Sequence, residues 1–350
     1  MKRIFVFISL MCVVALNANA KIWRVNNALG VSADFAKLSD AIDAAAVGDT
    51  LYVEGSATSY DGATLEKRLT IIGPGYYLDY DANEKTQWFK RSASIGSLLF
   101  NPGSEGALVS GLYLNTDNYL SAEHVTIERC FVYRINLGNG TNMSCDGDTI
   151  RNCAIFQGIT SSVAGGSFSA KGLMVYNNII YSAPDFRNGL ADVEAYFINN
   201  CFVSGGTFYT QNCVYQNNII YFGFFGEYGA SNFFTNNIFN SPSSVNNVPE
   251  GNNNQFGVSW GTIFISPSPD FWNSTPGMSP DGQYMLAEHS PAKGAGVVQG
   301  TVVDCGAFGG VAPYVLSGMP SIPSIYELKV PSQVNEGTPS INVSISAAAH

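Results

Sequence analysis

Hydrophobic residues recur along this chain in short segments, each introduced by asparagine. The pentapeptide NNIIY at Asn177 appears again unchanged at Asn217, and related segments begin at Asn152, Asn199 and Asn236. These segments are rich in β-branched and aromatic residues and are bounded by Gly, Asn and Ser, as is typical of short strands. They follow one another at intervals of 18 to 25 residues. That is too short for repeats built of helix pairs, and a leucine-rich lattice is missing.

Aligning the segments on the second residue of each pair predicts a solenoid. The anchors are Gly111, Cys130, Cys153, Asn178, Asn200, Asn218 and Asn237. The position three before the anchor and the position one after it are apolar in all seven segments. We therefore expect an all-β, right-handed parallel β-helix, in which successive coils pair at about 4.8 Å.

The repeated asparagines predict a structural ladder. Asparagine adopts the left-handed conformation of a tight bend at low cost, and stacked amides can bond to one another along the axis. The ladder is expected in the row Asn152, Asn177, Asn199, Asn217 and Asn236 or in the adjacent anchor row. The isoleucine after each pair is expected in the core, and Cys130 and Cys153 are expected side by side on adjacent coils.

The segment from Asp34 to Val47 predicts a short N-terminal capping helix. It places Phe35, Leu38, Ile42 and Ala45 on one helical face, and Gly48 follows as a stop signal. A helix here would cover the core and the unpaired strand edge at the open end of the solenoid.

The first 20 residues have the pattern of a signal peptide. Lys2 and Arg3 precede the apolar run 4–16, and Ala18-Asn19-Ala20 ends it with a small-residue cleavage pattern. No segment is long enough for a membrane span. We expect an exported protein that is extracellular or at the cell surface, with the periplasm as an alternative.

The chain after the predicted signal peptide is acidic. Without Lys2 and Arg3 it has 15 basic and 27 acidic residues, a net charge of 15 − 27 = −12. This charge argues against nucleic acid or anionic membrane as a partner.

Six cysteines remain after residue 20, namely Cys130, Cys145, Cys153, Cys201, Cys213 and Cys305. An even number in an exported chain permits disulfides. A chain of this length does not need them, so we expect mostly unpaired, buried thiols.

Two further regions resemble a known superfamily. The segments LSDAIDAAAVGDTLYVEG and KRLTIIGPG resemble the first turns of secreted bacterial right-handed parallel β-helix proteins of the pectate-lyase-like superfamily. YMLAEHSPAKGAG followed by DCGAFGG resembles their terminal coil. The resemblance implies a β-helix over residues 21–312, followed at 313–350 by a linker and one or two terminal strands. It is weak for activity, because the superfamily contains enzymes, adhesins and proteins of unknown role.

The catalytic elements that this resemblance suggests are incomplete. Hydrolases of the superfamily use an Asn-Thr-Asp element, and Asn115-Thr116-Asp117 matches it, but the Gly-His-Gly and Arg-x-Lys elements are missing. We interpret the match as a bend. Lyases of the superfamily hold Ca²⁺ with several carboxylates and remove a proton with Arg or Lys, so Ca²⁺ is expected only if the protein is a lyase. The candidates for such a site are Asp146, Asp148, Asp185, Asp192 and Glu194, with Arg129, Arg151 and Arg187 nearby. We expect Asp146 and Asp148 to cap a loop, Glu128 and Arg151 to form an ion pair, and no metal site or other cofactor. Catalytic residues remain unknown.

Aromatic residues are the remaining candidates for binding. Tyr133, Phe156, Tyr181 and Tyr221 lie three residues after their anchors, and Phe224, Phe225 and Tyr228 follow in one loop. Rings aligned on an outer face would suit sugar stacking, whereas an internal stack would serve the core. The sequence favours a secreted or surface protein that contacts polysaccharide without cleaving it. The alternatives are a polysaccharide lyase or glycoside hydrolase with an unrecognised site, and a structural or adhesive surface protein.

Overall fold

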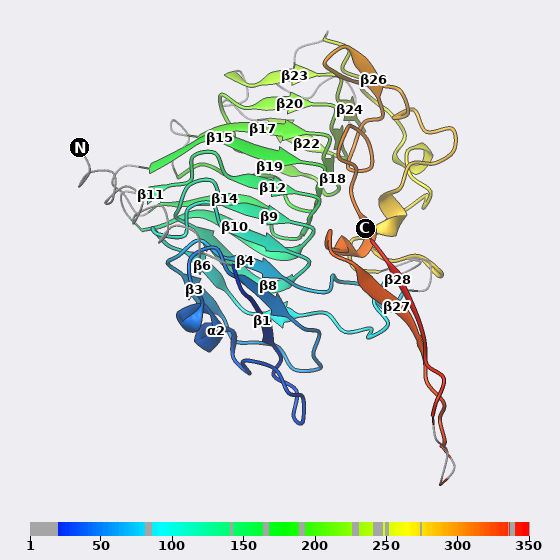
Figure 1. The fold of residues 1–350 in the computed structure, drawn as a ribbon. Coiled ribbons are helices and arrows are strands. Elements are labelled where there is room, and N and C mark those ends of the chain that lie inside the picture. Colours follow the sequence, from blue (N-terminus) through cyan, green and yellow to red (C-terminus); the bar gives the residue numbers. More distant parts are fainter. Residues whose placement is uncertain are drawn as a thin grey trace, which may run out of the picture.

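The chain forms a parallel β-helix, seen in a computed structural model (Figure 1). The structure describes residues 20–80, 86–140, 143–163, 168–188, 193–225, 231–240, 248, 252–273, 275–334, 336 and 340–349. The predicted signal peptide and Tyr228 thus lie outside the described residues, apart from Ala20. Two long parallel sheets run along the solenoid, and every coil contributes short strands to them.

The first sheet, called sheet A, carries one strand from each coil. Its order is β1 (Ile22–Val25), β2 (Thr50–Val53), β4 (Thr70–Ile72), β7 (Leu108–Ser110), β9 (Thr126–Glu128), β12 (Thr149–Arg151), β15 (Phe168–Tyr176), β17 (Val193–Ile198), β20 (Val214–Gln216) and β23 (Phe233–Thr235). The short strand β11 (Met143–Ser144) also pairs with β15.

The second sheet, called sheet B, follows sheet A after a two-residue corner in the coils from β7 onward, and after longer segments in the first coils. Its order is β3 (Ala63–Leu65), β6 (Leu98–Phe100), β8 (Tyr113–Leu120), β10 (Phe131–Gly140), β13 (Ala154–Ile155), β16 (Ile179–Ile180), β18 (Cys201–Phe202), β21 (Ile219–Ile220) and β24 (Ile238–Phe239). Strand β5 (Ser94–Ile95) pairs with β8, and β14 (Ile159–Val163) pairs with β10.

A third face completes the coils. It comprises the later halves of β8 and β10, strand β14, and the pair β19 (Gly206–Phe208) and β22 (Gly223–Phe225). Single bridges from Asp185 to Thr160 and to Tyr209 connect β14 with the residue after β19. The segments that return from this face to sheet A differ most in length. Met174 follows Thr160 by 14 residues, whereas Val214 follows Tyr209 by only 5, which accounts for the variable spacing of the repeat.

The interior of the solenoid changes character along its axis. The inward residue of each sheet A strand is aliphatic in the early coils, as in Val109, Ile127 and Ile150, and aromatic in the late ones. Phe197 and Phe234 stack on either side of Tyr215, with ring centroids 4.8 and 5.1 Å away and interplanar angles of 12° and 13°. All six side chains are fully buried, so the core is continuous from coil to coil.

The corner between sheets A and B explains the repeated Asn-Asn pair. Its first position has φ between 52° and 70° in the coils from Gly111 onward, at Gly111, Arg129, Asn152, Asn177, Asn199, Asn217 and Asn236. Left-handed backbone is unfavourable for most residues but is tolerated by Gly and Asn. The first asparagine therefore satisfies the backbone of the bend.

The second asparagine of each pair forms the stacked ladder. The Nδ2 of Asn178 donates to Oδ1 of Asn200 at 3.0 Å, and the same bond continues through Asn218 and Asn237 to Asn254. Each Oδ1 also accepts a backbone N–H from the preceding coil, at 2.8 to 3.0 Å. Of the two rows that the sequence allowed, the anchor row carries the continuous amide ladder. The other row has weaker amide contacts, from Asn217 to Asn199 and from Asn253 to Asn236, both at 3.3 Å.

Two details of the predicted alignment differ from the structure. Val109 pairs with Ile127, so Gly111 matches Arg129 and the first coil is displaced by one residue. The displacement arose because this coil has no Asn pair to align on. In addition, Ile179 packs outside sheet B, whereas Ile180 points into the solenoid core, because adjacent strand residues face opposite sides.

The N-terminal helix α2 (Leu38–Ala44) is shorter than predicted. Leu38, Ala41 and Ile42 are buried, so its apolar face covers the first coils as expected. Phe35 instead precedes the helix and forms a parallel bridge with Val25. It packs against Trp23, with ring centroids 5.3 Å apart.

The coils end earlier than residue 312. The last β-bridge of the solenoid joins Ile238 to Gln255. The segment 256–320, here called the C-terminal segment, lies along the outside of sheet B (yellow to orange in Figure 1). Its described residues form three short 3₁₀ helices, η4 (Trp260–Thr262), η5 (Gly282–Tyr284) and η6 (Leu316–Gly318), and the antiparallel hairpin of β25 (Gly296–Val298) and β26 (Thr301–Val303).

The C-terminal segment creates a second hydrophobic core. Its Phe264, Phe271, Tyr284 and Tyr314 pack onto the outward residues of sheet B, which are Phe131, Ala154, Ile179, Cys201, Ile219 and Ile238. The segment 256–312 therefore covers the solenoid instead of adding coils to it. Its sequence has no Asn-led period, so the alignment could not detect this role.

The first asparagine of four successive corners binds this segment through its side chain. Asn177 Nδ2 donates to the carbonyls of Ala307 and Gly309 at 2.8 and 2.7 Å. Asn152 Nδ2 donates to those of Ala312 and Pro313, both at 3.0 Å. Asn199 reaches Asp304 and Gly306, and Asn217 reaches Val297. The predicted ladder row thus serves as a docking row.

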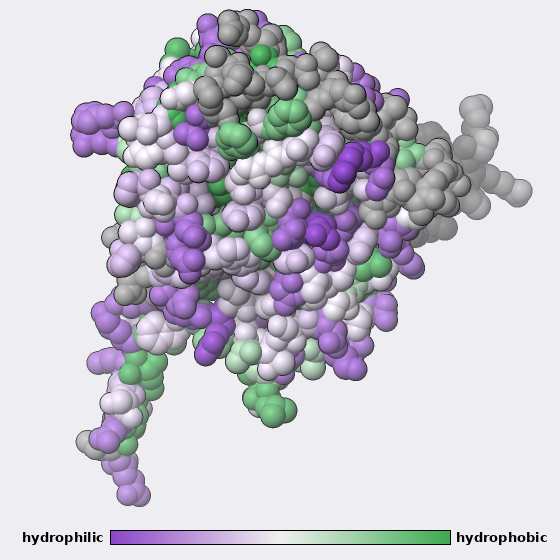
Figure 2. Space-filling view, turned by 180° about the vertical axis from the view of Figure 1, so that it is seen from behind, coloured by the Kyte–Doolittle hydropathy of each residue, from purple (hydrophilic) through white to green (hydrophobic). Residues whose placement is uncertain are grey.

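A second hairpin, β27 (Ser324–Lys329) with β28 (Ser344–Ala348), extends away from the body (Figure 1). Seen from behind, the surface of the body is mainly hydrophilic, with small separate hydrophobic areas (Figure 2). None of the helices in the described part of the chain has the length and hydrophobicity needed to cross a bilayer.

Candidate functional site

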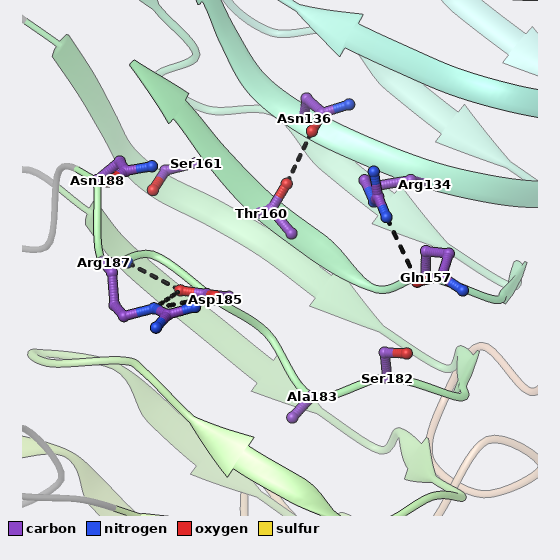
Figure 3. Close-up of a pocket in the computed structure, with 10 residues that line it drawn as sticks. All are labelled: Arg134, Asn136, Gln157, Thr160, Ser161, Ser182, Ala183, Asp185, Arg187 and Asn188. Atoms are coloured by element: carbon purple, nitrogen blue, oxygen red, sulfur yellow. Dashed lines mark hydrogen bonds and ion pairs between the residues drawn. The ribbon is translucent and has the colours of Figure 1, made fainter. Parts of the chain in front are cut away.

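A polar groove crosses several coils on the third face. It has a volume of about 560 Å³. Strand β10 supplies Arg134 and Asn136, strand β14 supplies Thr160 and Ser161, and the turn between β13 and β14 supplies Gln157. The chain after β16 supplies the remaining side, with Ser182, Ala183, Asp185, Arg187 and Asn188 (Figure 3).

The rows of the β-helix determine how these side chains line up. Asn136 pairs in register with Thr160, and Thr160 forms a bridge with Asp185. Equivalent residues on three successive coils therefore stand next to one another across the groove. The hydroxyl of Thr160 donates to Oδ1 of Asn136 at 2.8 Å (Figure 3). The amide of Asn136 is largely buried, so it presents a fixed polar edge.

Both arginines of the groove are paired with carboxylates. Arg134 Nη1 lies 3.0 Å from Asp117 Oδ2, with both side chains 32% exposed. Arg187 Nη2 lies 2.6 Å from Asp185 Oδ2. The Asp185 carboxylate raises the pKa of the Arg187 guanidinium above its ordinary value through this hydrogen bond and the accompanying charge attraction. The groove is thus rich in charge but locally balanced.

A second hollow of about 600 Å³ adjoins the groove through the Asp117–Arg134 ion pair. It is lined by Ser97, Asn115, Thr116, Asp117, Tyr119 and Tyr133. Asn115-Thr116-Asp117 lies within strand β8, where the register with β10 shifts between Leu114 and Asp117 and the partner strand changes from β5 to β6. The element thus lies at a bend, as the sequence suggested. It occupies the wall of a polar surface hollow.

Two polar atoms in these hollows have no partner among the described residues. They are the hydroxyl of Ser161, which lines the groove, and Oδ1 of Asn115, which lines the second hollow. Most buried polar atoms in proteins are hydrogen-bonded. Both atoms are themselves buried, so a ligand in either hollow does not meet them directly.

The predicted aromatic candidates are placed differently from one another. Tyr133 lines the second hollow, and its ring lies 5.6 Å from that of Phe156, which lies 5.2 Å from that of Tyr181. All three are half-buried. The predicted row thus exists as a chain of rings at the edge between sheet B and the third face.

The later aromatic candidates divide between surface and core. Tyr221 is 37% exposed and packs its ring against Trp260, with centroids 4.7 Å apart. Phe224 is 44% exposed on strand β22. Phe225 is fully buried against Phe208 and Tyr215, so it has no surface to offer a glycan. The alternation of side chains along β22 accounts for this difference.

The other candidate residues have structural contacts. Asp146 accepts the backbone N–H of Lys171 at 2.7 Å, and Asp148 accepts that of Val125 at 2.8 Å. Each bond connects neighbouring coils, which confirms their loop-capping role. Arg151 Nε donates to Glu128 at 2.8 Å, which confirms that ion pair. Within the described residues, no group of three or more His, Cys, Asp or Glu side chains is placed to hold a metal ion.

The cysteines are free and buried, as predicted, at Cys130, Cys145, Cys153, Cys201, Cys213 and Cys305. Cys130 and Cys153 occupy matching positions on adjacent coils, because Phe131 pairs in register with Ala154. Burial raises the pKa of the Cys130 thiol to about 12. This makes the thiol unreactive at neutral pH.

Two groove residues, Arg134 and Gln157, were not among the candidates from the sequence. Asp185 and Arg187 were candidates only for a lyase site, as was Asp192, which lies outside the described residues. A signal was present, because Arg134, Gln157 and Ser182 each directly follow a member of the predicted aromatic row. The coil corner turns at this point, so the position after the ring faces the groove. Loops of different length follow, which prevented alignment any further along the coil.

Comparison with known proteins found matches only among solved structures. No family model matches the sequence, and no curated protein matches it. Among solved structures, the chain is similar to the crystal structure of pectate lyase Pel9A, with 14% sequence identity and a TM-score of 0.41. That similarity covers 84% of this chain and 98% of the other.

Proposed function

We propose that this protein is exported and binds a neutral or weakly charged polysaccharide along the third-face groove without cleaving it. The observation that carries the proposal is the groove itself. Amides, hydroxyls and two internally neutralised arginine–aspartate pairs line a hollow that crosses successive coils. Sugars offer many hydroxyls that both donate and accept hydrogen bonds, which matches this lining.

The repeat of the β-helix supports a polymeric ligand. Coils follow one another at about 4.8 Å, so the groove offers similar groups at regular steps along its length. The adjoining hollow with Tyr133 extends this polar surface by further coils. A chain molecule with a short repeat can meet such a surface unit by unit.

Charge favours a neutral ligand over a polyanion. The chain has a net charge of −10, and each groove arginine is already paired with a carboxylate. A polyanion would have to compete with Asp117 and Asp185 while approaching a negatively charged molecule. A neutral glycan can accept hydrogen bonds from the same guanidinium groups without displacing their partners.

The proposal that the glycan is not cleaved rests on the same two arginine–aspartate pairs. An arginine that removes a proton must itself be deprotonated, and a neighbouring carboxylate stabilises the charged form. Asp117 and Asp185 already accept from arginines. They therefore do not fit a Ca²⁺ site, which needs several carboxylate and carbonyl oxygens directed at one point.

The test is retention of the purified protein, residues 21–350, on a panel of immobilised neutral and acidic polysaccharides. We expect retention on at least one neutral polymer, and the variant Arg134→Ala/Gln157→Ala should lose it. Arg151→Ala is a matched control, because Arg151 pairs with Glu128 on sheet A, away from the groove lining. Failure to bind any glycan would leave a structural or adhesive surface protein.

Cleavage is a second candidate function, favoured by one observation. Two arginines and Asp185 line the groove, and Asp117 lies at its border with the second hollow. Such a cluster suits a lyase or hydrolase. Incubation of the protein with the same glycans, with and without Ca²⁺, distinguishes the two functions. Unsaturated uronate absorbance or new reducing ends would establish an enzyme and overturn the non-catalytic proposal.

A further inference from the structure

We propose that Trp272 forms an aromatic subsite at the edge of the groove, which stacks on one pyranose ring of the bound glycan. This inference rests on the proposed function and adds a binding residue to it. Trp272 is 47% exposed although it belongs to the C-terminal segment, whose other large apolar residues mostly form the second core. An indole left half in solvent offers a flat apolar face.

The indole is held in place by rings beneath it. Its centroid lies 4.2 Å from that of Phe156 in an edge-to-face arrangement with an interplanar angle of 69°. It also lies 5.6 Å from Phe271 and 6.2 Å from Phe131. Phe131 and Phe271 are buried, so Trp272 rests on the firm surface of the second core.

The backbone that carries Trp272 is fixed from both sides. Asp270 Oδ1 accepts the backbone N–H of Trp272 at 2.8 Å and that of Asn273 at 2.9 Å. These two bonds lower the pKa of Asp270. Gln283, which is 1% exposed, donates from Nε2 to the carbonyls of both Asp270 and Asn273 at 3.0 Å. A side chain fixed in this way loses little conformational entropy on binding.

The ring chain connects Trp272 to the groove. Phe156 contacts Trp272 on one side and Tyr133 on the other, and Tyr133 lines the second hollow. Gln157, the residue directly after Phe156, lines the groove and lies within hydrogen-bonding distance of Arg134 (Figure 3). Polar groups and exposed aromatic surface therefore meet along one edge.

This combination specifies the chemistry of the ligand. A pyranose with equatorial hydroxyls has a polar rim and two faces of C–H groups, so its rim can bond to amides while one face stacks on an indole. Apolar and aromatic contact surface carries much of the binding energy in such sites, and polar groups set the orientation. We therefore expect the groove to take glucan or xylan chains in preference to chains of galacturonate.

Titration with xylohexaose and cellohexaose tests the subsite, with intrinsic tryptophan fluorescence and calorimetry as readouts. We expect Trp272→Ala to bind about tenfold more weakly than wild type and Trp272→Phe to lie between the two. The emission change on binding should be lost in both variants. Trp88→Ala is the matched control, because Trp88 is 53% exposed and its backbone N–H bonds to Ile325, outside the ring chain.

The outcomes separate this inference from the proposed function. If wild type binds and Trp272→Ala binds equally well with an unchanged melting temperature, the subsite is wrong while the groove proposal stands. Equal losses in Trp272→Ala and Trp88→Ala would also overturn it. If wild type binds neither these sugars nor any polymer of the panel, the proposed function itself fails.

Discussion

The early and late coils of the solenoid build the same corner with different side chains. In the late coils, the ladder position holds Asn178, Asn200, Asn218 and Asn237, whose amides bond to one another and to the backbone. In the early coils the same position holds Cys130 and Cys153. Their thiols donate to nearby carbonyls such as Glu128 O at 3.1 Å, and Cys130 accepts Leu112 N–H only at 3.5 Å.

The comparison separates what the fold requires from what strengthens it. Strand register continues unchanged through both regions, so backbone pairing alone builds the coil. The corner φ is positive in both regions, at Arg129 as well as at the asparagines. The amide ladder and the stack of Phe197, Tyr215 and Phe234 are additions that join the late coils more firmly.

Removing an amide from the middle of the ladder should have the largest effect. Asn218 accepts the N–H of Asn200, donates to Phe197 O at 2.8 Å and bonds to two neighbouring amides. Asn218→Leu leaves several buried groups unpaired at about 1–3 kcal/mol each. We expect a loss of about 4 kcal/mol or more in the free energy of unfolding, measured by urea denaturation. Cys153→Ala in the early coils is the control and should cost clearly less.

Truncation of the central ring of the aromatic stack should have the second-largest effect on stability. Tyr215→Ala removes a fully buried ring between Phe197 and Phe234, and such truncations cost about 3–5 kcal/mol. Tyr215→Phe removes only the hydroxyl contact with Thr210, at 2.9 Å. Its cost should be about 1 kcal/mol. Similar losses for both variants, measured by thermal denaturation, would mean that packing of the ring is not the stabilising feature.

Substitutions in the docking row should cost less stability, and this cost can be separated into loss of the bend and loss of the hydrogen bonds. Asn199 combines a left-handed φ of 53° with bonds to the C-terminal segment at Asp304 and Gly306. Asn199→Leu should cost about 1–3 kcal/mol, since it loses both features. Asn199→Gly keeps the bend and loses only the bonds, so it should fall between Leu and wild type in chemical denaturation. A glycine variant as unstable as the leucine variant would show that the bend contributes nothing.

The early coils also contain a buried acid where an amide would fit better. Asp148 is fully buried, and desolvation raises its pKa well above the ordinary value. A raised pKa means that ionisation is harder in the folded state, so stability falls as pH rises from the unfolded-state pKa toward the folded one. Asp148→Asn should therefore raise the melting temperature at pH 7 more than at pH 4. An equal shift at both pH values would show that Asp148 does not titrate in this way.

The smallest expected change extends the ladder into the early coils. Cys153 already donates its backbone N–H to Oδ1 of Asn178 at 2.9 Å. Cys153→Asn would place one more amide on the ladder and satisfy it from Asn178. We expect a gain of about 1 kcal/mol in the free energy of unfolding. A loss of stability would mean that the early coils cannot accommodate the late geometry.

The comparison of early and late coils also explains which parts of the fold the sequence could predict. Asn-led segments such as NNIIY predicted the solenoid and its late coils, because the geometry of the corner determines the role of each residue in them. The coil at Ser110-Gly111 was aligned with an error of one residue, since it has no Asn pair to define the corner. Residues 256–320 have no period, and their burial against Ile179 and Ile219 depends on contacts between distant parts of the chain.

The candidate site was predicted less completely than the fold. Tyr133, Phe156 and Tyr181 were found because they share a row, but Trp272 contributes to the same surface from 116 residues beyond Phe156. Arg134 directly follows Tyr133 of that row, which is a usable signal, whereas Asp185 reaches the groove after a segment that the row does not mark. Residues such as Asp185 and Trp272 join this surface only through the tertiary fold, so sequence spacing carries no signal for them.

The most direct test of the proposed function is a crystal structure of the protein with xylohexaose or cellohexaose. We expect an intact sugar chain lying along the third face, bonded to Arg134, Gln157 and Asp185, with one ring stacked on Trp272. An empty groove at saturating sugar, a cleaved oligosaccharide, or a ligand bound to another face would contradict it.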